Sequence, residues 1–141
     1  MVFHYNNRVD PEIKAPSILI IDDTVDSVVL LERILVDQGF KVRSETNCFS
    51  AIESAQSDTP DLIILDVSMP EMDGFEVCRR LKEIEDLKDV PVIFLSAMAS
   101  VNDRDKALST GGADYINKPF GIDELIDGIE KLLPNSMSQE P

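Results

Sequence analysis

Three acidic residues stand where two buried strands of this chain are expected to end. The apolar run from Ser17 closes with Asp22 and Asp23, and a second run closes with Asp66. Capping of a helix is the ordinary role of Asp23 or Thr24, and it would account for one acid at that place. Three carboxylates packed together, however, repel one another and must either take up protons or hold a cation. Mg²⁺ is suited to such a group because it uses one or two protein carboxylates, keeps several waters and accepts phosphate oxygens.

A hydroxyl and an ammonium group complete this set of strand-end residues. Ser96 closes a third apolar run, and Lys118 follows a short fifth segment just before a proline. Alone, each would be a hydrogen-bonding or turn residue. Together with a metal they provide what a transferred phosphoryl group requires, since its charge lies on three equatorial oxygens. A carboxylate can act as the nucleophile and form an aspartyl phosphate. Asp66 is the best candidate because it ends a strand rather than starting a helix.

The elements that must position these residues alternate along the chain. Short apolar runs typical of strands buried on both faces alternate with segments of helical periodicity. This alternation predicts a doubly wound α/β domain, a five-stranded parallel sheet with helices on both faces. Ligands of such folds bind beyond the carboxyl ends of the strands. The expected strands are Ser17–Asp22, Lys41–Thr46, Leu62–Asp66, Val92–Ser96 and Asp114–Asn117. Helical spacing is seen at 28–35, 49–57, 75–84, 102–110 and 122–133, and Gly39 is expected to end the first helix.

Composition limits the kinds of function that this sequence can have. The 141 residues suit one domain, with residues 1–16 as a flexible leader, 17–133 as the folded unit and 134–141 as a flexible tail. A net charge of −14 argues against binding nucleic acid or anionic membrane. No apolar run is long enough to span a membrane. The two cysteines, Cys48 and Cys78, are expected to be small core residues of a protein in the reducing cytoplasm.

Four segments resemble the receiver domain of two-component response regulators. They are Ile20–Asp23, Leu65–Gly74, Leu95–Ala97 and Tyr115–Phe120, and they occur in the order and spacing of that family across about residues 17–133. The resemblance implies a flavodoxin-like fold with strand order 2-1-3-4-5. It also implies a signalling domain that phosphorylates and dephosphorylates itself, rather than a turnover enzyme.

The same resemblance implies a role for each strand-end residue. Asp66 would accept the phosphoryl group from a phosphohistidine, and Lys118, in a cis bond to Pro119, would pair with a phosphoryl oxygen. Ser96 would donate its hydroxyl to the phosphoryl group, and Tyr115 would rotate in response. The metal ligands implied for Mg²⁺ are Asp22, Asp23, Asp66 and the backbone carbonyl of Ser68. By resemblance, Ser68 and Met98 would also influence how water reaches the phosphoryl group.

Three other interpretations compete with a phosphorylated receiver. Phosphatases related to haloacid dehalogenases also use a strand-end aspartate with Mg²⁺, but they need an acid two residues later, where Ser68 stands. A pseudo-receiver that only binds partners usually lacks one of the acids or the lysine, and this chain keeps all of them. An ordinary nucleotide-binding domain would have a glycine-rich loop where Asp22, Asp23 and Thr24 stand.

The partners follow from the resemblance alone. They are a sensor histidine kinase or a phosphotransfer protein as donor, a downstream protein as recipient of the signal, and a homodimer through the 102–133 face. The sequence is compatible with a stand-alone regulator and with a receiver taken from a hybrid kinase or a larger regulator.

Overall fold

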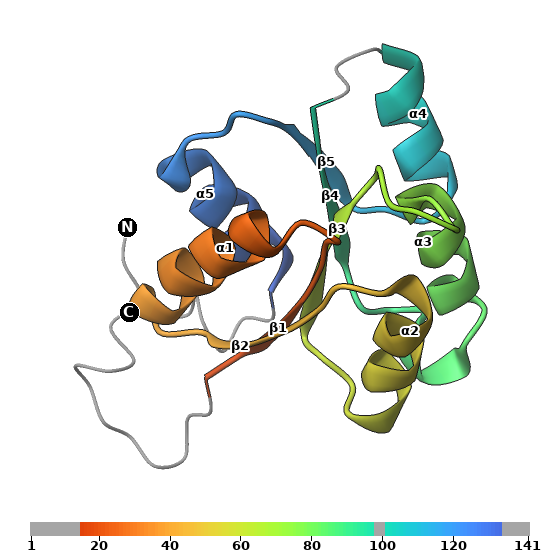
Figure 1. Cartoon of the computed structure of the whole chain (residues 1–141), viewed down its shortest axis with the longest axis horizontal. Coiled ribbons are helices and arrows are strands. Elements are labelled where there is room, and N and C mark those ends of the chain that lie inside the picture. The colour runs from red at the N-terminus through yellow and green to blue at the C-terminus, as the bar shows by residue number, and fades with distance from the viewer. Residues whose placement is uncertain (1–14, 98–100, 134–141) are drawn as a thin grey trace.

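Five short strands alternate with five α-helices along the chain (Figure 1). The computed structural model describes residues 15–97 and 101–133. The strands are β1 (Ser17–Ile21), β2 (Lys41–Glu45), β3 (Leu62–Asp66), β4 (Val92–Ser96) and β5 (Asp114–Asn117). The helices are α1 (Val25–Asp37), α2 (Cys48–Ser57), α3 (Gly74–Lys82), α4 (Val101–Ser109) and α5 (Ile122–Leu132), with a short 3₁₀ helix, η1 (Glu85–Leu87), before β4.

The strands form one parallel sheet in the order β2-β1-β3-β4-β5, which confirms the predicted flavodoxin-like topology. The chain winds outward from β1 in one direction and from β3 in the other, so the direction of winding changes between these two strands. β3 is therefore the central strand. Its last residue, Asp66, lies at the edge of the sheet where ligands of this architecture bind.

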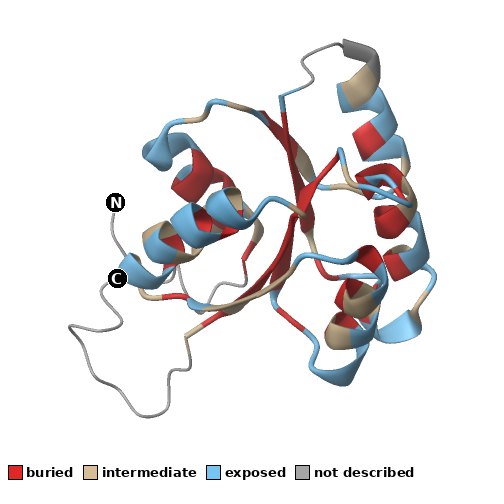
Figure 2. Cartoon of the chain, viewed as in Figure 1, coloured by how far each residue is buried: buried red, intermediate tan, exposed pale blue. Residues whose placement is uncertain are grey.

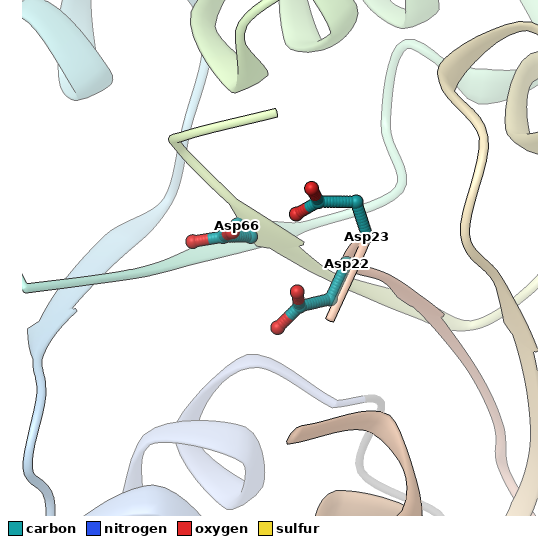
Figure 3. Close-up of side chains that lie close together, drawn as sticks. All are labelled: Asp22, Asp23 and Asp66. Atoms are coloured by element: carbon teal, nitrogen blue, oxygen red, sulfur yellow. The ribbon is translucent and has the colours of Figure 1, made fainter. Parts of the chain in front are cut away.

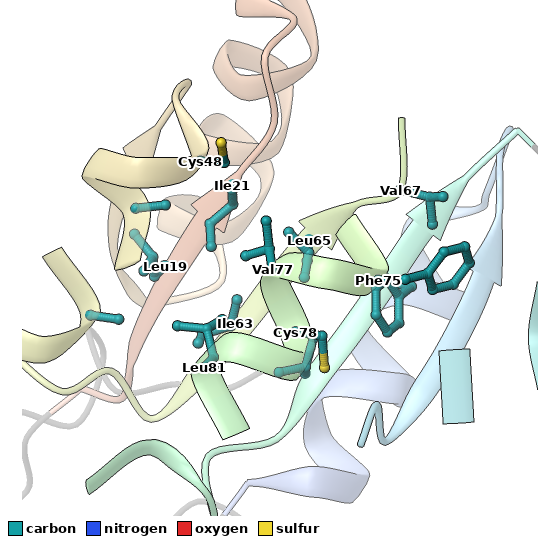
Figure 4. Packing of buried hydrophobic residues seen from close by; sticks show 14 of the residues in the cluster. Leu19, Ile21, Cys48, Ile63, Leu65, Val67, Phe75, Val77, Cys78 and Leu81 are labelled. Carbon is teal, nitrogen blue, oxygen red and sulfur yellow. The ribbon is translucent and has the colours of Figure 1, made fainter. Parts of the chain in front are cut away.

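Alternation of side chains along the strands builds a core on each face of the sheet. In β1, Ile18 and Ile20 pack with α1 and α5, whereas Leu19 and Ile21 pack with the helices on the opposite face. Figure 1 shows α1 and α5 on one side of the sheet and α2, α3 and α4 on the other. The buried residues follow this division (Figure 2), and Figure 4 shows the packing of α3 against β1 and β3. The covering of both faces explains why the central strands are apolar throughout.

Several element boundaries agree with the sequence predictions. Three strands have the predicted bounds, whereas the first and second each end one residue earlier, at Ile21 and Glu45. Gly39 follows α1 with a φ of 98° and donates its N–H to the carbonyl of Val36, so it ends the helix as expected. The 3₁₀ helix η1 was not predicted, because three residues carry no periodic signal.

Some predictions concern residues at the margins of the described chain. The leader and tail lie outside it, except for Ala15 and Pro16, and so does Met98. Pro16 is buried, and its carbonyl accepts a hydrogen bond from the N–H of Lys41. Cys48 and Cys78 are free and buried, as predicted. Among the helices of residues 15–97 and 101–133, none has the length and apolar character that a membrane span requires.

Candidate functional site

The three acids singled out in the sequence meet at the carboxyl edge of the sheet. One carboxylate oxygen from each of Asp22, Asp23 and Asp66 lies within 4.8 Å of the others. Figure 3 shows the three carboxylates pointing into a common space beyond β1 and β3. Asp22 and Asp66 are buried, and Asp23 is the most exposed of the three. Parallel pairing of β1 with β3 produces this cluster, since it brings the ends of both strands to the same edge.

Asp66 is held by the loop that follows β3. The N–H of Gly74 donates to the carbonyl of Val67 at 2.7 Å, and a Cβ on Gly74 would lie 2.3 Å from the backbone oxygen of Asp66. Only glycine fits this close approach of two backbone segments. Within the same loop, Glu71 has a φ of 72°. The backbone N–H of Ser68 donates to the Asp66 carboxylate. The loop therefore folds tightly beside the nucleophile and leaves the carboxylate accessible at its tip.

Asp22 and Asp23 differ in what they contact. Thr24 is the N-cap residue of α1, but its side chain makes no capping hydrogen bond. Instead, Asp22 accepts a hydrogen bond from the N–H of Thr24 at 2.9 Å, with Oδ1 as the acceptor. The capping interpretation of Asp23 or Thr24 is therefore wrong. Asp23 is left directed toward the other carboxylates.

Lys118 supplies positive charge to the cluster. Its Nζ lies 3.7 Å from Asp22 Oδ2 and 3.7 Å from Asp66 Oδ1. The peptide bond between Lys118 and Pro119 is cis, as predicted. The N–H of Lys118 donates to the carbonyl of Ser96 at 2.8 Å, which ties the end of β5 to the end of β4. One ammonium group against three carboxylates leaves a formal charge of −2 when all of them are ionised.

This surplus of negative charge is visible in the ionisation of Asp66. Burial raises the pKa of Asp66 from 3.8 to about 6, and the charges of Asp22 and Asp23 raise it further, against the opposing effect of Lys118. A raised pKa means that the ionised carboxylate lacks full compensation within the protein. A divalent cation would provide that compensation.

Ser96 and Tyr115 lie deeper than the acids. Ser96 ends β4 and is 1% exposed. β3 pairs Asp66 with Leu95, so Ser96 lies one position further toward the same edge. Tyr115 in β5 is 2% exposed and belongs to the core between the sheet and α2, α3 and α4. All the strand-end residues predicted from the sequence are thus gathered at one edge, with Tyr115 behind them.

Two residues at the mouth of the site were missed in the sequence. Asp103 and Lys106 on α4 line a cleft of about 570 Å³ together with Asp23 and Ser68. Lys106 Nζ lies 4.8 Å from the centroid of the Phe75 ring. Exposed charged residues in a weakly amphipathic helix give no sequence signal, and only the position of α4 over the loop reveals them.

The donor set at this edge suits Mg²⁺. Carboxylate and carbonyl oxygens are hard ligands, and a site with few protein ligands leaves room for waters and a phosphoryl oxygen. The formal charge of −2 and the raised pKa of Asp66 agree with a divalent ion. Asp23 and Asp66 would hold it directly, with Asp22 beside them.

Comparison with known proteins identifies the module. Residues 18–130 match the model of the response regulator receiver domain. The chain belongs to this family. A receiver domain is the phosphorylated module of two-component signal transduction, and its strand-end acids, hydroxyl and lysine are the set gathered here.

Relatives and solved structures agree with this assignment. The chain is 39% identical over 125 residues to the transcriptional regulatory protein PrrA of Mycobacterium tuberculosis, covering 89% of this chain and 53% of that protein. It is 40% identical over 116 residues to the response regulator MprA of Mycobacterium ulcerans, covering 82% of this chain and 49% of that protein. The chain therefore spans about half the length of these curated relatives.

The structural neighbours include receivers that belong to kinases. The receiver domain of a signal transduction histidine kinase from Syntrophus aciditrophicus is 37% identical, with a TM-score of 0.78, covering 84% of this chain and 90% of that one. The receiver domain of a sensor histidine kinase from Pseudomonas aeruginosa is 29% identical, with a TM-score of 0.78, covering 84% and 98%. The latter structure has a magnesium ion coordinated in its active-site cleft.

Proposed function

We propose that Asp66 is the residue of this receiver that accepts the phosphoryl group. The observation that supports it is the position of Asp66 at the end of the central strand, among Asp22, Asp23 and Lys118. An Asp66 oxygen forms a bond to phosphorus while the bond between phosphorus and the donor's histidine nitrogen breaks. The leaving imidazole nitrogen keeps the electron pair and takes up a proton.

The surrounding residues have separate tasks in this proposal. Lys118, already within reach of the Asp66 carboxylate, pairs with a phosphoryl oxygen, and the Ser96 hydroxyl donates to another. Asp22, Asp23, Asp66 and the Ser68 carbonyl hold Mg²⁺, which when bound neutralises charge on the phosphoryl oxygens. Tyr115 then changes its position and carries the signal to the surface formed by residues 102–133.

Trapping the phosphorylated residue tests this assignment. The protein is incubated with acetyl phosphate and Mg²⁺, reduced with borohydride, which converts an aspartyl phosphate to homoserine, and analysed by peptide mass spectrometry. We expect homoserine at position 66 and not at 22 or 23. Modification at another aspartate, with none at Asp66, would contradict the proposal.

The alternative of a phosphatase of the haloacid dehalogenase type finds no support at the site. Ser68, two residues after Asp66, is exposed and carries no carboxylate. We infer a self-phosphorylating and self-dephosphorylating signalling domain rather than a turnover enzyme. Its folded unit comprises residues 17–133, and its location is the cytoplasm, with which the two free cysteines agree.

An apolar groove beside Lys118 supports a protein as the natural phosphoryl donor. The groove, of about 320 Å³, lies between α1 and the segment that leads into α5, and Leu30 and Ile122 at its rim are 57% and 51% exposed. Its lining residues are Ser27, Leu30, Leu31, Ile34, Lys118, Pro119, Phe120 and Ile122. A helical histidine kinase or phosphotransfer protein docked here would bring its phosphohistidine toward Asp66.

Phosphotransfer rates with two donors test this docking site. Leu30→Ser should slow transfer from a phosphorylated kinase or phosphotransfer protein severalfold and leave labelling by acetyl phosphate unchanged. Phe49→Ser is the matched control, since Phe49 is equally exposed, at 52%, but lies on α2. Equal rates in both variants would move the docking site elsewhere.

The output partner in this proposal is a downstream protein or a second copy of the chain, bound through the 102–133 face. Leu108 on α4 is 46% exposed on this face. Nucleic acid and membrane are not proposed as ligands of this chain, whose net charge is −14. Sedimentation with and without beryllofluoride would separate a phosphorylation-dependent dimer from a monomer that awaits another protein.

A further inference from the structure

Helix α4 is attached to the domain in an unusual way. Among its described side chains, from 103 to 109, Ala107 is fully buried, whereas Arg104 and Lys106 are exposed. Each of these two cations nevertheless lies over an aromatic ring of another element. The Cζ atom of Arg104 is 5.5 Å from the centroid of the Tyr115 ring, and Lys106 Nζ is 4.8 Å from that of Phe75. Cation–aromatic contacts therefore replace much of the apolar packing that holds an ordinary surface helix.

Arg104 makes two contacts with the same residue. Besides lying over the ring, its Nη2 donates a hydrogen bond to the backbone carbonyl of Tyr115 at 3.0 Å, in a partly buried setting. The planar guanidinium can do both at once, because it stacks through its face and donates through its edge. The contact joins the side chain of α4 to both the ring and the backbone of β5. Movement of the Tyr115 ring would break the stacking half of this contact.

We propose that Arg104 is a positioning residue that latches Tyr115 in its buried position and thereby sets how readily the domain switches. This inference rests on the proposed function, in which Tyr115 moves upon phosphorylation. A contact made in the resting state and lost in the switched state favours the resting state by its own free energy. Removing it raises the switched population, and a phosphoryl mimic that prefers the switched state then binds more tightly by the same factor.

The chain offers a direct probe of this latch. It has two tyrosines, Tyr5 and Tyr115, and no tryptophan. Fluorotyrosine incorporated into the Tyr5→Phe protein therefore gives one fluorine resonance, which belongs to Tyr115. The signal is followed during titration with beryllofluoride at saturating Mg²⁺. The same protein carries Arg104→Gln, Arg104→Lys or no further change.

We expect Arg104→Gln to lower the half-saturating beryllofluoride concentration about fivefold, the size expected for one cation–aromatic contact. Its fluorine resonance should already lie partly toward the switched position before the mimic is added. Arg104→Lys keeps the cation but not the fork, so it should restore part of the native behaviour. The matched control is Lys106→Gln, which removes the same charge from the same helix but contacts Phe75. It should change the half-saturating concentration by less than about twofold.

The outcomes separate the latch from the switch. A Tyr115 resonance that does not respond to beryllofluoride in the native protein would overturn the proposed switch and the latch with it. A native resonance that responds, together with an Arg104→Gln titration identical to the native one, would overturn the latch alone. Equal shifts in Arg104→Gln and Lys106→Gln would also overturn it, because they would indicate a general effect of charge on α4.

Discussion

The Asp66 carboxylate is nucleophilic only when it is ionised, and burial together with Asp22 and Asp23 opposes its ionisation. Lys118 offsets part of this opposition but lies 3.7 Å away, beyond the length of a close ion pair. The metal-free site is therefore strained electrostatically at neutral pH. At the residue scale, reactivity and stability are in conflict at this one side chain.

Replacing Asp66 with asparagine should separate these two properties. Asp66→Asn should abolish labelling by acetyl phosphate, because an amide is a poor nucleophile. In the absence of metal it should also raise the free energy of unfolding at pH 7 by about 1–2 kcal/mol, since one of three repelling charges is removed. Labelling assays and urea unfolding check both effects. Asp123→Asn, an exposed change on α5, should alter neither, and undiminished labelling of Asp66→Asn would place the acceptor elsewhere.

Asp22 and Asp23 should contribute unequally to binding of Mg²⁺. Asp22 is already engaged with Lys118 and the Thr24 N–H, whereas Asp23 is directed toward the cluster. Native affinity should be millimolar, because the ion keeps most of its waters. Asp23→Ala should weaken binding more than Asp22→Ala, while Asp22→Ala should be the more destabilising. Titrations followed by NMR, combined with unfolding curves, measure both rankings, and nanomolar affinity or equal losses would contradict this account.

At the element scale, the site depends on the loop that connects β3 to α3. Asp73 caps α3 by accepting a hydrogen bond from the N–H of Glu76, and Gly74 closes the loop against β3 through its bond to Val67. The loop thus places α3, the Asp66 backbone and the Ser68 backbone in one rigid arrangement. A change that separates Gly74 from β3 should be felt at all three.

Gly74→Ala should be destabilising because the new Cβ would lie 2.3 Å from the Asp66 backbone oxygen, where no side-chain movement can relieve the overlap. We expect a loss of about 3 kcal/mol, at the upper end for overpacking, and slower labelling of the folded fraction. Gly121→Ala is the control: a Cβ there meets nothing within 4 Å, and its cost should stay below about 1 kcal/mol. Thermal unfolding and acetyl phosphate labelling measure both, and equal stabilities would contradict the close-approach argument.

At the scale of the whole molecule, the proton on Asp66 links folding to pH. The folded domain keeps this proton up to about pH 6, whereas a free carboxyl releases it near 3.8. Between these values the folded state binds more protons than the unfolded state. The free energy of unfolding therefore falls as pH rises through this window, and the penalty is complete above pH 6.

Without metal, we expect Asp66 to lower the free energy of unfolding by about 2–3 kcal/mol between pH 4 and pH 7, at about 1.4 kcal/mol per pKa unit. Asp66→Asn should remove this part of the pH dependence. Mg²⁺ at ten times its dissociation constant should return about 1.4 kcal/mol to the native protein at pH 7. Urea unfolding across pH, with EDTA or Mg²⁺, tests the sign. A native minus Asp66→Asn difference that is constant with pH would contradict it.

The sequence by itself determined the architecture and most of the site. Apolar runs that close in Asp22, Asp66 and Ser96 specify strands buried on both faces, and their alternation with helices leaves a parallel sheet as the solution. Every parallel strand ends at the same edge, so strand-end polarity was enough to predict that these side chains would meet. Gly39 was likewise readable, because local backbone conformation determines its place.

Only the tertiary structure decided the contacts that depend on distance between elements. The sequence could not tell whether Asp23 or Thr24 caps α1, because that depends on Lys118 competing for the neighbouring Asp22. It was silent on Arg104, since an exposed arginine on a weak helix resembles any solvated charge until the fold brings α4 across β5. Periodicity records which residues avoid water. It contains nothing on which polar groups, far apart in the chain, become neighbours when the sheet closes.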